Sequence, residues 1–299
     1  MSDAADKPGG RLRTASGVTA AGAATDLVLA AGKIAAGVLS GSQAIFADGL
    51  HSLSDLATDL AVLAGIRISG RPADEDHHYG HRRAMTLVTS GLAVVLLAAA
   101  GFVLVRAVRS FLHPAAPVRV GLPLAAAAAS VVLKEALYHV TVRVGRRIDD
   151  TSIIANAWHH RSDAASSVAA AVGLTAVAVG GPRWRFMDGV TALVLACFLG
   201  VVAWKILRDA VAELMDRAPS RDMTERIRGA VAATPGVRDF HAFRARRLGG
   251  KVEMDLHVLV DPALSVRDGH DIASSVQQKV RDCCPEVLNV IVHVEPAED

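Results

Sequence analysis

The stretch Phe46-Ala-Asp-Gly-Leu-His-Ser-Leu-Ser-Asp-Leu-Ala-Thr-Asp59 places one histidine and three aspartates in an apolar segment long enough to cross a membrane. Asp48, His51, Asp55 and Asp59 lie near one face of a helix, because eleven residues at about 100° each sum to about three turns. A carboxylate at membrane depth costs at least about 2.5–3.5 kcal/mol. We therefore expect this face to line a wet cavity or to bind a cation.

A second stretch, Asn156-Ala-Trp-His-His-Arg-Ser-Asp163, repeats the pattern His-x-x-Ser-Asp. Its His159 and Asp163 are four residues apart, and so are His51 and Asp55, so each pair places two ligands on one helix face. Two facing helices would supply two nitrogen and two oxygen ligands, a tetrahedral set that suits Zn²⁺ and is compatible with Fe²⁺, Co²⁺ or Mn²⁺. The sequence predicts a cation site made of these four residues.

These polar residues are also compatible with structural roles. A single His–Asp pair is more often a buried structural pair than a metal site, whereas two copies at membrane depth favour the metal site. Asp48, Asp59 and His160 fit two roles about equally: lining a pore and handling protons, or lying at a helix end near water.

The composition indicates a membrane domain followed by a small soluble domain. Hydrophobic residues make up 52% of the 299 residues, aromatic residues only 4%, and the net charge is +2. These values exclude a disordered chain and argue against a nucleic-acid-binding surface. Three cysteines, two of them adjacent, make neither a disulfide framework nor a CxxC metal site. Six segments are candidates for spanning a bilayer: residues 18–39, 44–66, 84–105, 120–142, 153–179 and 190–207.

The basic residues predict the orientation of these spans. Residues 1–17 are polar and carry Lys7, Arg11 and Arg13, which predicts a cytoplasmic tail and not a cleaved signal peptide. With six spans, ten lysines and arginines flank the membrane on the side of the termini, against five on the other side. Both termini are therefore expected in the cytoplasm, in a multi-pass protein of the inner or plasma membrane.

After residue 207 the sequence becomes soluble in character. Helical patterns cover residues 221–233 and 268–283, and strand patterns cover 237–247, 251–260 and 287–294. The order α-β-β-α-β predicts a compact α+β module of about 90 residues. We expect three parts: the tail 1–17, an all-α six-span transport domain 18–207 and a cytoplasmic domain 208–299.

Two further groups of histidines and acids lie outside the spans. The loop Arg71-Pro-Ala-Asp-Glu-Asp-His-His-Tyr-Gly-His81 fits a divalent cation site and a solvated polar loop equally well. The C-terminal region contributes a second group from predicted strands and a helix: His241, His257, His270, His293 and Glu295. Strands bring scattered residues together on one face, although the sequence alone does not show that these meet.

These features together resemble the cation diffusion facilitator family, over residues 18 to 296. The resemblance is carried by four motifs: Ala47-Asp-Gly-Leu-His-Ser-Leu-Ser-Asp55, Pro72-Ala-Asp-Glu-Asp-His-His-Tyr-Gly-His81, Asn156-Ala-Trp-His-His-Arg-Ser-Asp163 and Met215-Asp-Arg217. Members of this family export divalent metals, usually in exchange for protons, as homodimers. The resemblance implies the same activity here, with dimerisation through a ferredoxin- or metallochaperone-like C-terminal domain.

The resemblance also implies roles for particular residues. It makes His51, Asp55, His159 and Asp163 the transport site, and this set of two histidines and two aspartates is associated with zinc, since many members have aspartate in place of His51. The implied loop site is Asp74, His77 and His81. The implied cytoplasmic site is His241, His257, His270, His293 and Glu295, where glutamate replaces a bridging aspartate. An implied interlock salt bridge joins Arg83, where lysine is usual, to Asp216.

We therefore expect a Zn²⁺/H⁺ antiporter that exports zinc from the cytoplasm. Zinc would be both the substrate and a regulatory ligand, with protons as counter-ion and no organic cofactor. An enzyme is not expected, because an intramembrane zinc protease needs His-Glu-x-x-His and the sequence lacks this motif. The alternatives are a metal-gated channel, an iron, cobalt or manganese exporter, and a metal sensor. Four ligands hold one ion tightly, which favours a carrier over a channel.

Overall fold

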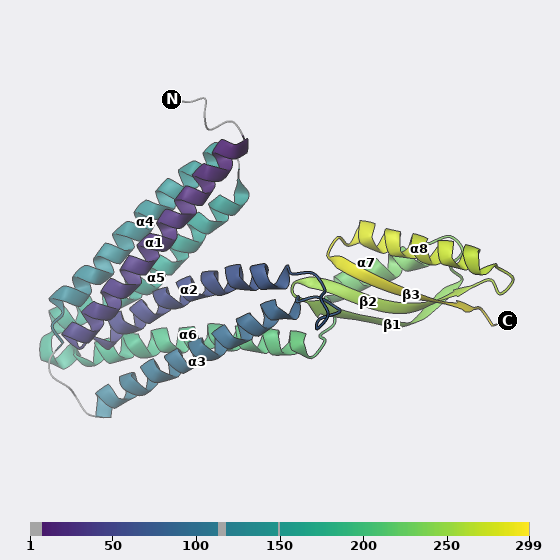
Figure 1. Cartoon of the computed structure of the whole chain (residues 1–299). Coiled ribbons are helices and arrows are strands. Elements are labelled where there is room, and N and C mark those ends of the chain that lie inside the picture. Colours follow the sequence, from purple (N-terminus) through teal and green to yellow (C-terminus); the bar gives the residue numbers. More distant parts are fainter. Residues whose placement is uncertain (1–7, 113–117, 149, 299) are drawn as a thin grey trace. The chain divides into compact units, whose positions relative to one another are not determined.

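Six long helices form the membrane-spanning part of the described chain (Figure 1). They come from a computed structural model that describes residues 8–112, 118–148 and 150–298. The helices are α1 Pro8–Ser40, α2 Gln43–Ser69, α3 Arg83–Leu112, α4 Gly121–Ile148, α5 Thr151–Gly180 and α6 Phe186–Leu214, with a 3₁₀ turn, η1 Gly181–Trp184, between the last two. Each predicted span overlaps one of these helices, so the predicted helical membrane domain is confirmed.

Five of the six helices are long and apolar enough to cross a membrane, over Thr19–Ser40, Arg83–Leu112, Gly121–Ile148, Ile153–Trp184 and Phe186–Leu214. Helix α2 is not among these five, because it carries Asp48, Asp55 and Asp59 within its apolar stretch. Helix α1 begins at Pro8, inside the stretch that we expected to be a tail, and proline suits a first helical turn because it lacks an N–H. Residues 1–7 of the expected tail lie outside the described residues.

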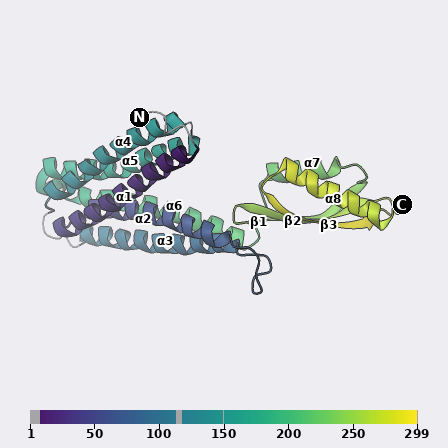
Figure 2. The same ribbon diagram turned by 45° about the horizontal axis from the view of Figure 1, so that its top comes forward.

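The membrane helices lie in two groups of three. Figures 1 and 2 show α1, α4 and α5 side by side, and α2, α3 and α6 side by side. Small residues dominate the shared core, which includes Ala47, Ala107, Ala127, Ala170 and Ala192. Small side chains allow helix backbones to approach closely where lipid gives no hydrophobic drive.

Packing divides the chain into two units. The membrane unit comprises Met1–Ala61 and Gly91–Lys205, and the C-terminal unit comprises Val62–Ser90 and Ile206–Asp299. The C-terminal unit therefore includes the end of α2, the loop that follows it and the start of α3. Both intramembrane His–Asp pairs belong to the membrane unit.

The soluble part of the C-terminal unit has the predicted order α-β-β-α-β, which is confirmed. Its elements are α7 Arg221–Ala232, β1 Asp239–Leu248, β2 Lys251–Val260, α8 Val266–Cys283 and β3 Val287–Pro296. The sheet order is β1-β2-β3, with β1 and β2 antiparallel and β2 and β3 parallel. The β1–β2 turn uses Gly249 and Gly250 at φ of 58° and 78°, a region that glycine enters without strain.

Helices α7 and α8 cover one face of this sheet (Figures 1 and 2). Along β2 the buried residues alternate, and Met254, Leu256 and Val258 join Ile227 of α7 and Val276 of α8 in one apolar core. The intervening residues of β2 therefore point to the opposite face.

Three boundaries of the C-terminal elements differ from the prediction by two residues, for local reasons. Strand β1 starts at Asp239 and not at 237, after a turn in which Gly236 has φ 89°. Helix α8 starts at Val266, two residues early, because Ser265 and Asp268 form a capping box. Strand β3 runs on to Pro296, which places Glu295 inside the strand.

Candidate functional site

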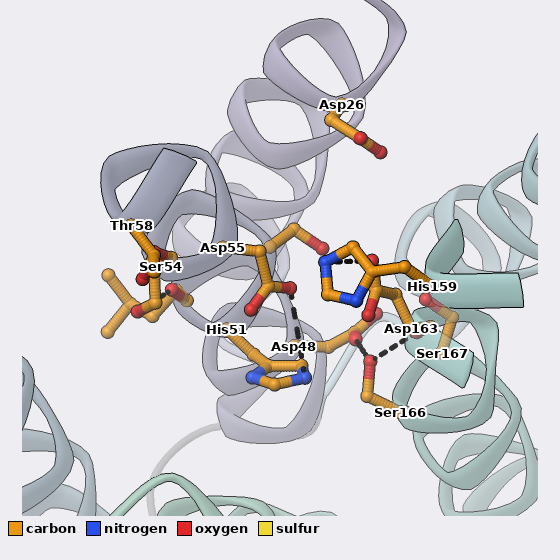
Figure 3. A network of polar contacts seen from close by, with 12 residues as sticks. Asp26, Asp48, His51, Ser54, Asp55, Thr58, His159, Asp163, Ser166 and Ser167 are labelled. Carbon is orange, nitrogen blue, oxygen red and sulfur yellow. Dashed lines mark hydrogen bonds and ion pairs between the residues drawn. The ribbon is translucent and has the colours of Figure 1, made fainter. Parts of the chain in front are cut away.

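The two predicted His–Asp pairs face each other across the membrane unit. On α2, His51 Nε2 lies 3.9 Å from Asp55 Oδ2, and on α5, His159 Nε2 lies 3.7 Å from Asp163 Oδ2. Figure 3 shows the side chains of the two pairs turned toward one another. We call these four residues the quartet. The structure thus places all four predicted ligands in one region, two from each helix.

The quartet has atoms available for a cation. Asp55 Oδ2 and His51 Nδ1 are buried, and neither has a hydrogen-bond partner among the described residues. Asp163 and His51 are largely buried, with side chains 10% and 14% exposed, whereas His159 is 51% exposed. Buried polar atoms are usually paired, so partnerless polar atoms beside the exposed imidazole of His159 are a binding-site feature.

The opposite side of α2 is satisfied within its own helix. Ser54 Oγ donates to the Leu50 carbonyl oxygen at 2.7 Å, and Thr58 Oγ1 donates to the Ser54 carbonyl oxygen at 2.8 Å. Figure 3 shows both hydroxyls pointing away from the quartet. Asp59, the other residue that we considered for proton handling, is exposed.

A buried ion pair lies beside the quartet and was missed by the sequence analysis. Lys33 Nζ of α1 lies 2.9 Å from Asp48 Oδ2, and the two side chains are 1% and 0% exposed. Lys33 also donates to Ser52 Oγ at 2.9 Å and Ser167 Oγ at 2.8 Å, and Ser166 Oγ donates to Asp48 Oδ1 at 2.7 Å. Asp48 therefore lies in a closed, buried ion pair, which fits neither of the two roles that the sequence left open for it. Ser130 Oγ lies 3.0 Å from Ser167 Oγ. We call the following residues the Lys33 layer: Lys33, Asp48, Ser52, Ser130, Ser166 and Ser167.

A second buried lysine connects the quartet to α1. Lys134 Nζ of α4 lies 3.4 Å from Asp163 Oδ2 and 3.7 Å from Asp26 Oδ1. Asp26 Oδ2 lies 3.4 Å from His160 Nδ1, so His160 turns to α1 and does not complete the quartet. Glu135, the neighbouring charge on α4, pairs on the outside with Arg161 at 3.3 Å.

A signal for Asp26 and Lys33 was present in the sequence. They are seven residues apart, which is two helical turns, so these opposite charges share one face of α1. Two charges on one face of a membrane helix require partners on other helices. The weak hydropathy of α1 obscured this signal.

The loop after α2 forms a compact ligand cluster in the C-terminal unit. Asp74 Oδ1 lies 3.1 Å from His77 Nδ1, and Asp74 Oδ2 lies 3.5 Å from His81 Nε2. One ligand atom from each of the three lies within 4.8 Å of the others. Desolvation raises the pKa of Asp74, but hydrogen bonds from the His77 backbone and ring outweigh it, so the pKa lies below its ordinary value. We call these three residues the loop cluster.

The sheet forms a second compact cluster around Glu295. Glu295 Oε2 lies 2.8 Å from His241 Nε2, and Glu295 Oε1 lies 2.8 Å from His257 Nδ1 and 3.4 Å from His293 Nε2. Desolvation raises the pKa of Glu295, but the His241 and His257 rings lower it by more. We call these four residues the Glu295 cluster. His270 lies exposed on α8 and is not in this group, which corrects the five-residue expectation.

Strand register explains the Glu295 cluster. His241 is opposite His257 in the β1–β2 pairing, and His257 is opposite His293 in the β2–β3 pairing. A bulge between His241 and Arg244, with Ala242 at φ 49°, sets the end of β1 in this register. The three imidazoles therefore form a row on the sheet face away from α7 and α8.

Arg83 and Asp216 form an ion pair within the C-terminal unit. Arg83 Nη2 lies 2.6 Å from Asp216 Oδ1, and Arg246 Nη1 lies 3.4 Å from Asp216 Oδ2. The Arg83 hydrogen bond is the main reason that the pKa of Asp216 lies below its ordinary value. Next to it, Glu213 accepts hydrogen bonds from Thr86 Oγ1 at 2.6 Å and the Gly249 amide at 2.8 Å. The start of α3, the end of α6 and the β1–β2 turn are thereby joined.

Two family models match the chain. One, described as the cation efflux transmembrane domain, matches residues 19–215, and the other, described as the cation efflux protein cytoplasmic domain, matches residues 219–297. A variant of the MamM C-terminal domain in its nickel form is 29% identical and covers 26% of this chain and 100% of its own, at a TM-score of 0.26.

Curated relatives match along almost the whole chain. The manganese efflux system protein MneP of Bacillus subtilis is 30% identical over 276 residues, 91% of this chain and 92% of its own length. Metal tolerance protein C1 of Arabidopsis thaliana is 34% identical, over 92% of this chain and 61% of its own. The magnetosome protein MamB of Magnetospirillum gryphiswaldense is 29% identical, over 87% of both chains.

The site geometry and these matches lead to one assignment. Helices of the membrane unit hold two facing His–Asp pairs, and an α+β module follows them. The first family model covers more than half of the chain, and MneP is matched over most of its length. The chain therefore belongs to the cation diffusion facilitator family of divalent metal efflux transporters.

Proposed function

We propose that the quartet is the transport site, that zinc is its preferred cargo and that protons move in the opposite direction. The observation that carries this proposal is the pair of facing His–Asp pairs on α2 and α5. Two imidazoles and two carboxylates make a four-ligand set of the kind that Zn²⁺ takes in tetrahedral geometry.

Manganese is the second candidate cargo. MneP, a relative at 30% identity, is described as a manganese efflux protein. Mn²⁺ favours carboxylate and carbonyl oxygens, whereas imidazole suits zinc and the later transition metals. His51 and His159 supply half of the ligands of the quartet, so its chemistry supports zinc over manganese.

Proton exchange follows from the ligand types. Imidazole and carboxylate bind a metal only when deprotonated, so protons and metal compete for the same atoms. A site that is loaded on the side of high pH and unloaded on the side of low pH releases metal as protons arrive. The gradient then drives export without any further ligand.

The Lys33 layer supports access to the quartet from one side. Asp48 precedes His51 by three residues on α2, and Ser167 follows Asp163 by four on α5, so this layer lies about one helical turn toward the α1–α2 turn. Its ion pair and hydrogen bonds close that direction, whereas His159 is open. We propose that this arrangement receives cargo from the cytoplasm, with both termini on that side.

The clusters of the C-terminal unit fit a regulatory role in this proposal. The Glu295 cluster has its four side chains in contact on a solvent-facing sheet surface, where a zinc ion would be sampled from the cytoplasm. We propose that metal bound there favours a homodimer formed through the C-terminal domain. The loop cluster would be a second, more exposed binding site.

Flux in proteoliposomes tests the transport proposal. Purified full-length protein should move zinc faster when an opposing pH gradient is imposed, and Asp55→Asn should reduce this flux to the level of empty liposomes. Asp209→Asn, the same chemical change at an exposed carboxylate of α6, is the matched control and should keep the flux.

Two outcomes would contradict the proposal. Flux that does not respond to the gradient would remove proton exchange, and flux that survives Asp55→Asn would remove the quartet as the transport site. In a metal panel, manganese flux above zinc flux in the wild type would replace zinc by the second candidate. His51→Asp should shift the panel toward manganese, because it exchanges an imidazole for a carboxylate.

A further inference from the structure

Two lysines are buried in the membrane unit, and they are held differently. Lys33 and Lys134 side chains are each 1% exposed. Lys33 Nζ has three acceptors at 2.8–2.9 Å: Asp48 Oδ2, Ser52 Oγ and Ser167 Oγ. An ammonium group has three N–H donors, so each donor of Lys33 has a close partner. Lys33 is therefore fixed in place.

Lys134 lies between two carboxylates at longer distances. Asp163 Oδ2 on α5 is 3.4 Å away, and Asp26 Oδ1 on α1 is 3.7 Å away. A charge-assisted N–H···O bond is about 2.7–2.9 Å long, so neither carboxylate binds the ammonium closely. The Lys134 ammonium can therefore exchange Asp163 for Asp26 at a small cost in free energy.

Asp26 is arranged to accept the ammonium. Its Oδ2 faces His160 Nδ1 at 3.4 Å. Its Oδ1 faces Lys134, is buried and has no hydrogen-bond partner among the described residues. A buried acceptor without a partner is unfavourable, so closer approach of Lys134 would satisfy this atom.

Asp163 connects this arrangement to the quartet. Its Oδ2 is the atom that faces Lys134 at 3.4 Å and also the atom that faces His159 at 3.7 Å. A divalent cation bound between His159 and Asp163 would use the same carboxylate oxygen that faces the ammonium. Two positive charges at such a distance repel strongly in a poorly solvated site.

We propose that Lys134 is a tethered cation that neutralises Asp163 while the transport site is empty and moves to Asp26 when a divalent cation binds. This inference rests on the proposed role of the quartet. In the empty state Lys134 pairs with Asp163. In the loaded state Lys134 pairs with Asp26, and Asp163 is free to bind the cargo. Lys134 competes with the cargo for Asp163, which lowers cargo affinity and assists release.

Zinc binding to the purified full-length protein tests the exchange. Binding that is lost in Asp55→Asn defines the quartet component and separates it from the C-terminal clusters. For that component we expect about tenfold tighter binding in Lys134→Met, because a competing charge is removed. Asp26→Asn should change affinity by roughly tenfold in the opposite direction, since Lys134 then stays on Asp163.

Matched variants separate this role from general effects. Lys134→Arg keeps the charge and should retain near-normal affinity, and Lys205→Met removes an exposed lysine of α6 and should leave affinity unchanged. The double variant Lys134→Met/Asp26→Asn should bind like Lys134→Met alone, because Asp26 acts through the lysine. Unchanged or weaker binding in Lys134→Met would overturn the proposal. A loss from Asp26→Asn that persists without Lys134 would also overturn it, by making Asp26 a direct ligand.

A metal-free measurement keeps this test separate from the proposed function. Lys134→Met leaves Asp163 buried without its counter-charge, so the apo protein should melt at a lower temperature. Adding Asp163→Asn should recover most of that loss, whether or not the quartet carries zinc. No recovery would overturn the Lys134–Asp163 pairing. Recovery together with zinc binding that does not depend on the quartet would keep this pairing and would overturn the transport-site proposal, and with it the exchange.

Discussion

The membrane unit buries charged residues and exposes apolar ones, whereas the soluble part of the C-terminal unit buries apolar residues and exposes charged ones. In the helices, Lys33, Asp48 and Lys134 are enclosed, whereas Val95 and Val201 are exposed. In the sheet domain the apolar residues are enclosed, and charged pairs such as Arg244–Asp255 lie at the surface. The same rule, that each side chain seeks a compatible solvent, gives inverse results when the solvent is lipid.

This difference also separates two kinds of ligand site. The Glu295 cluster is set by strand register, and ligand atoms of His241, His257 and Glu295 already lie within 4.8 Å of one another. The quartet is divided between two helices, and a lysine faces one of its carboxylates. With the proposed roles, ligands on separate helices would let the quartet release its ion, whereas ligands on one sheet would keep the Glu295 cluster assembled.

The largest expected effect comes from breaking the enclosed Lys33–Asp48 pair. Lys33→Met leaves a carboxylate buried without its cation, and such a break costs about 3–5 kcal/mol. The surface pair gives the contrast, since Arg244→Met should cost about 0–1 kcal/mol. Thermal unfolding of both variants in detergent measures the difference. Equal losses of stability would show that burial does not decide how much each ion pair contributes. As a control, adding Asp48→Leu to Lys33→Met should recover part of the loss, because it removes the unpaired carboxylate.

Sequence alone predicted the parts of the site that rest on short-range periodicity. The quartet follows from two His-x-x-x-Asp spacings, because residues four apart share a helix face. Helix contacts across the bundle do not follow from spacing, so the partners of Asp48 and Asp163 on α1 and α4 were missed. In α1 the charges at 26 and 33 indicated a polar face without indicating what it meets.

The C-terminal unit shows the same limit in a sheet. Because β3 extends past the predicted end at residue 294 to Pro296, alternation places His293 and Glu295 on one strand face. The position of His241 in the Glu295 cluster depends on a bulge in β1 and on the register that pairs His241 with His257. No spacing rule predicts either feature from the sequence. His270 was grouped with them by residue type, but α8 carries it outside the cluster.

An intermediate effect is expected at the Glu295 cluster. Since its ligands are already assembled, His257→Ala should weaken zinc binding about tenfold or more while unfolding of the metal-free domain changes little. Titration calorimetry on full-length protein carrying Asp55→Asn removes the quartet component, and the loop cluster is the same in the variant and its parent, so the difference between them reports the Glu295 cluster. His270→Ala is the matched control and should bind zinc as its parent does. Weaker binding in His270→Ala would instead mean that His270 reaches the Glu295 cluster and contributes a ligand.

The smallest effect is expected at Arg83–Asp216, where both partners are about half exposed. The Arg83 hydrogen bond lowers the pKa of Asp216 below 3.8, its ordinary value, so the folded state favours the charged carboxylate. The pair therefore stabilises the fold above about pH 4, and this contribution fades as the pH falls through the lowered pKa. Arg83→Met should lower the free energy of unfolding at pH 7 by less than about 1 kcal/mol, which shows as a slightly lower melting temperature, and the deficit should shrink at pH 3. Arg83→Lys, which keeps the charge but loses the fork geometry, should melt between the wild type and Arg83→Met. A deficit that stays the same from pH 7 to pH 3 would mean that Arg83 stabilises the α3–α6 contact through its bond to the Leu214 carbonyl, which does not titrate, and not through Asp216.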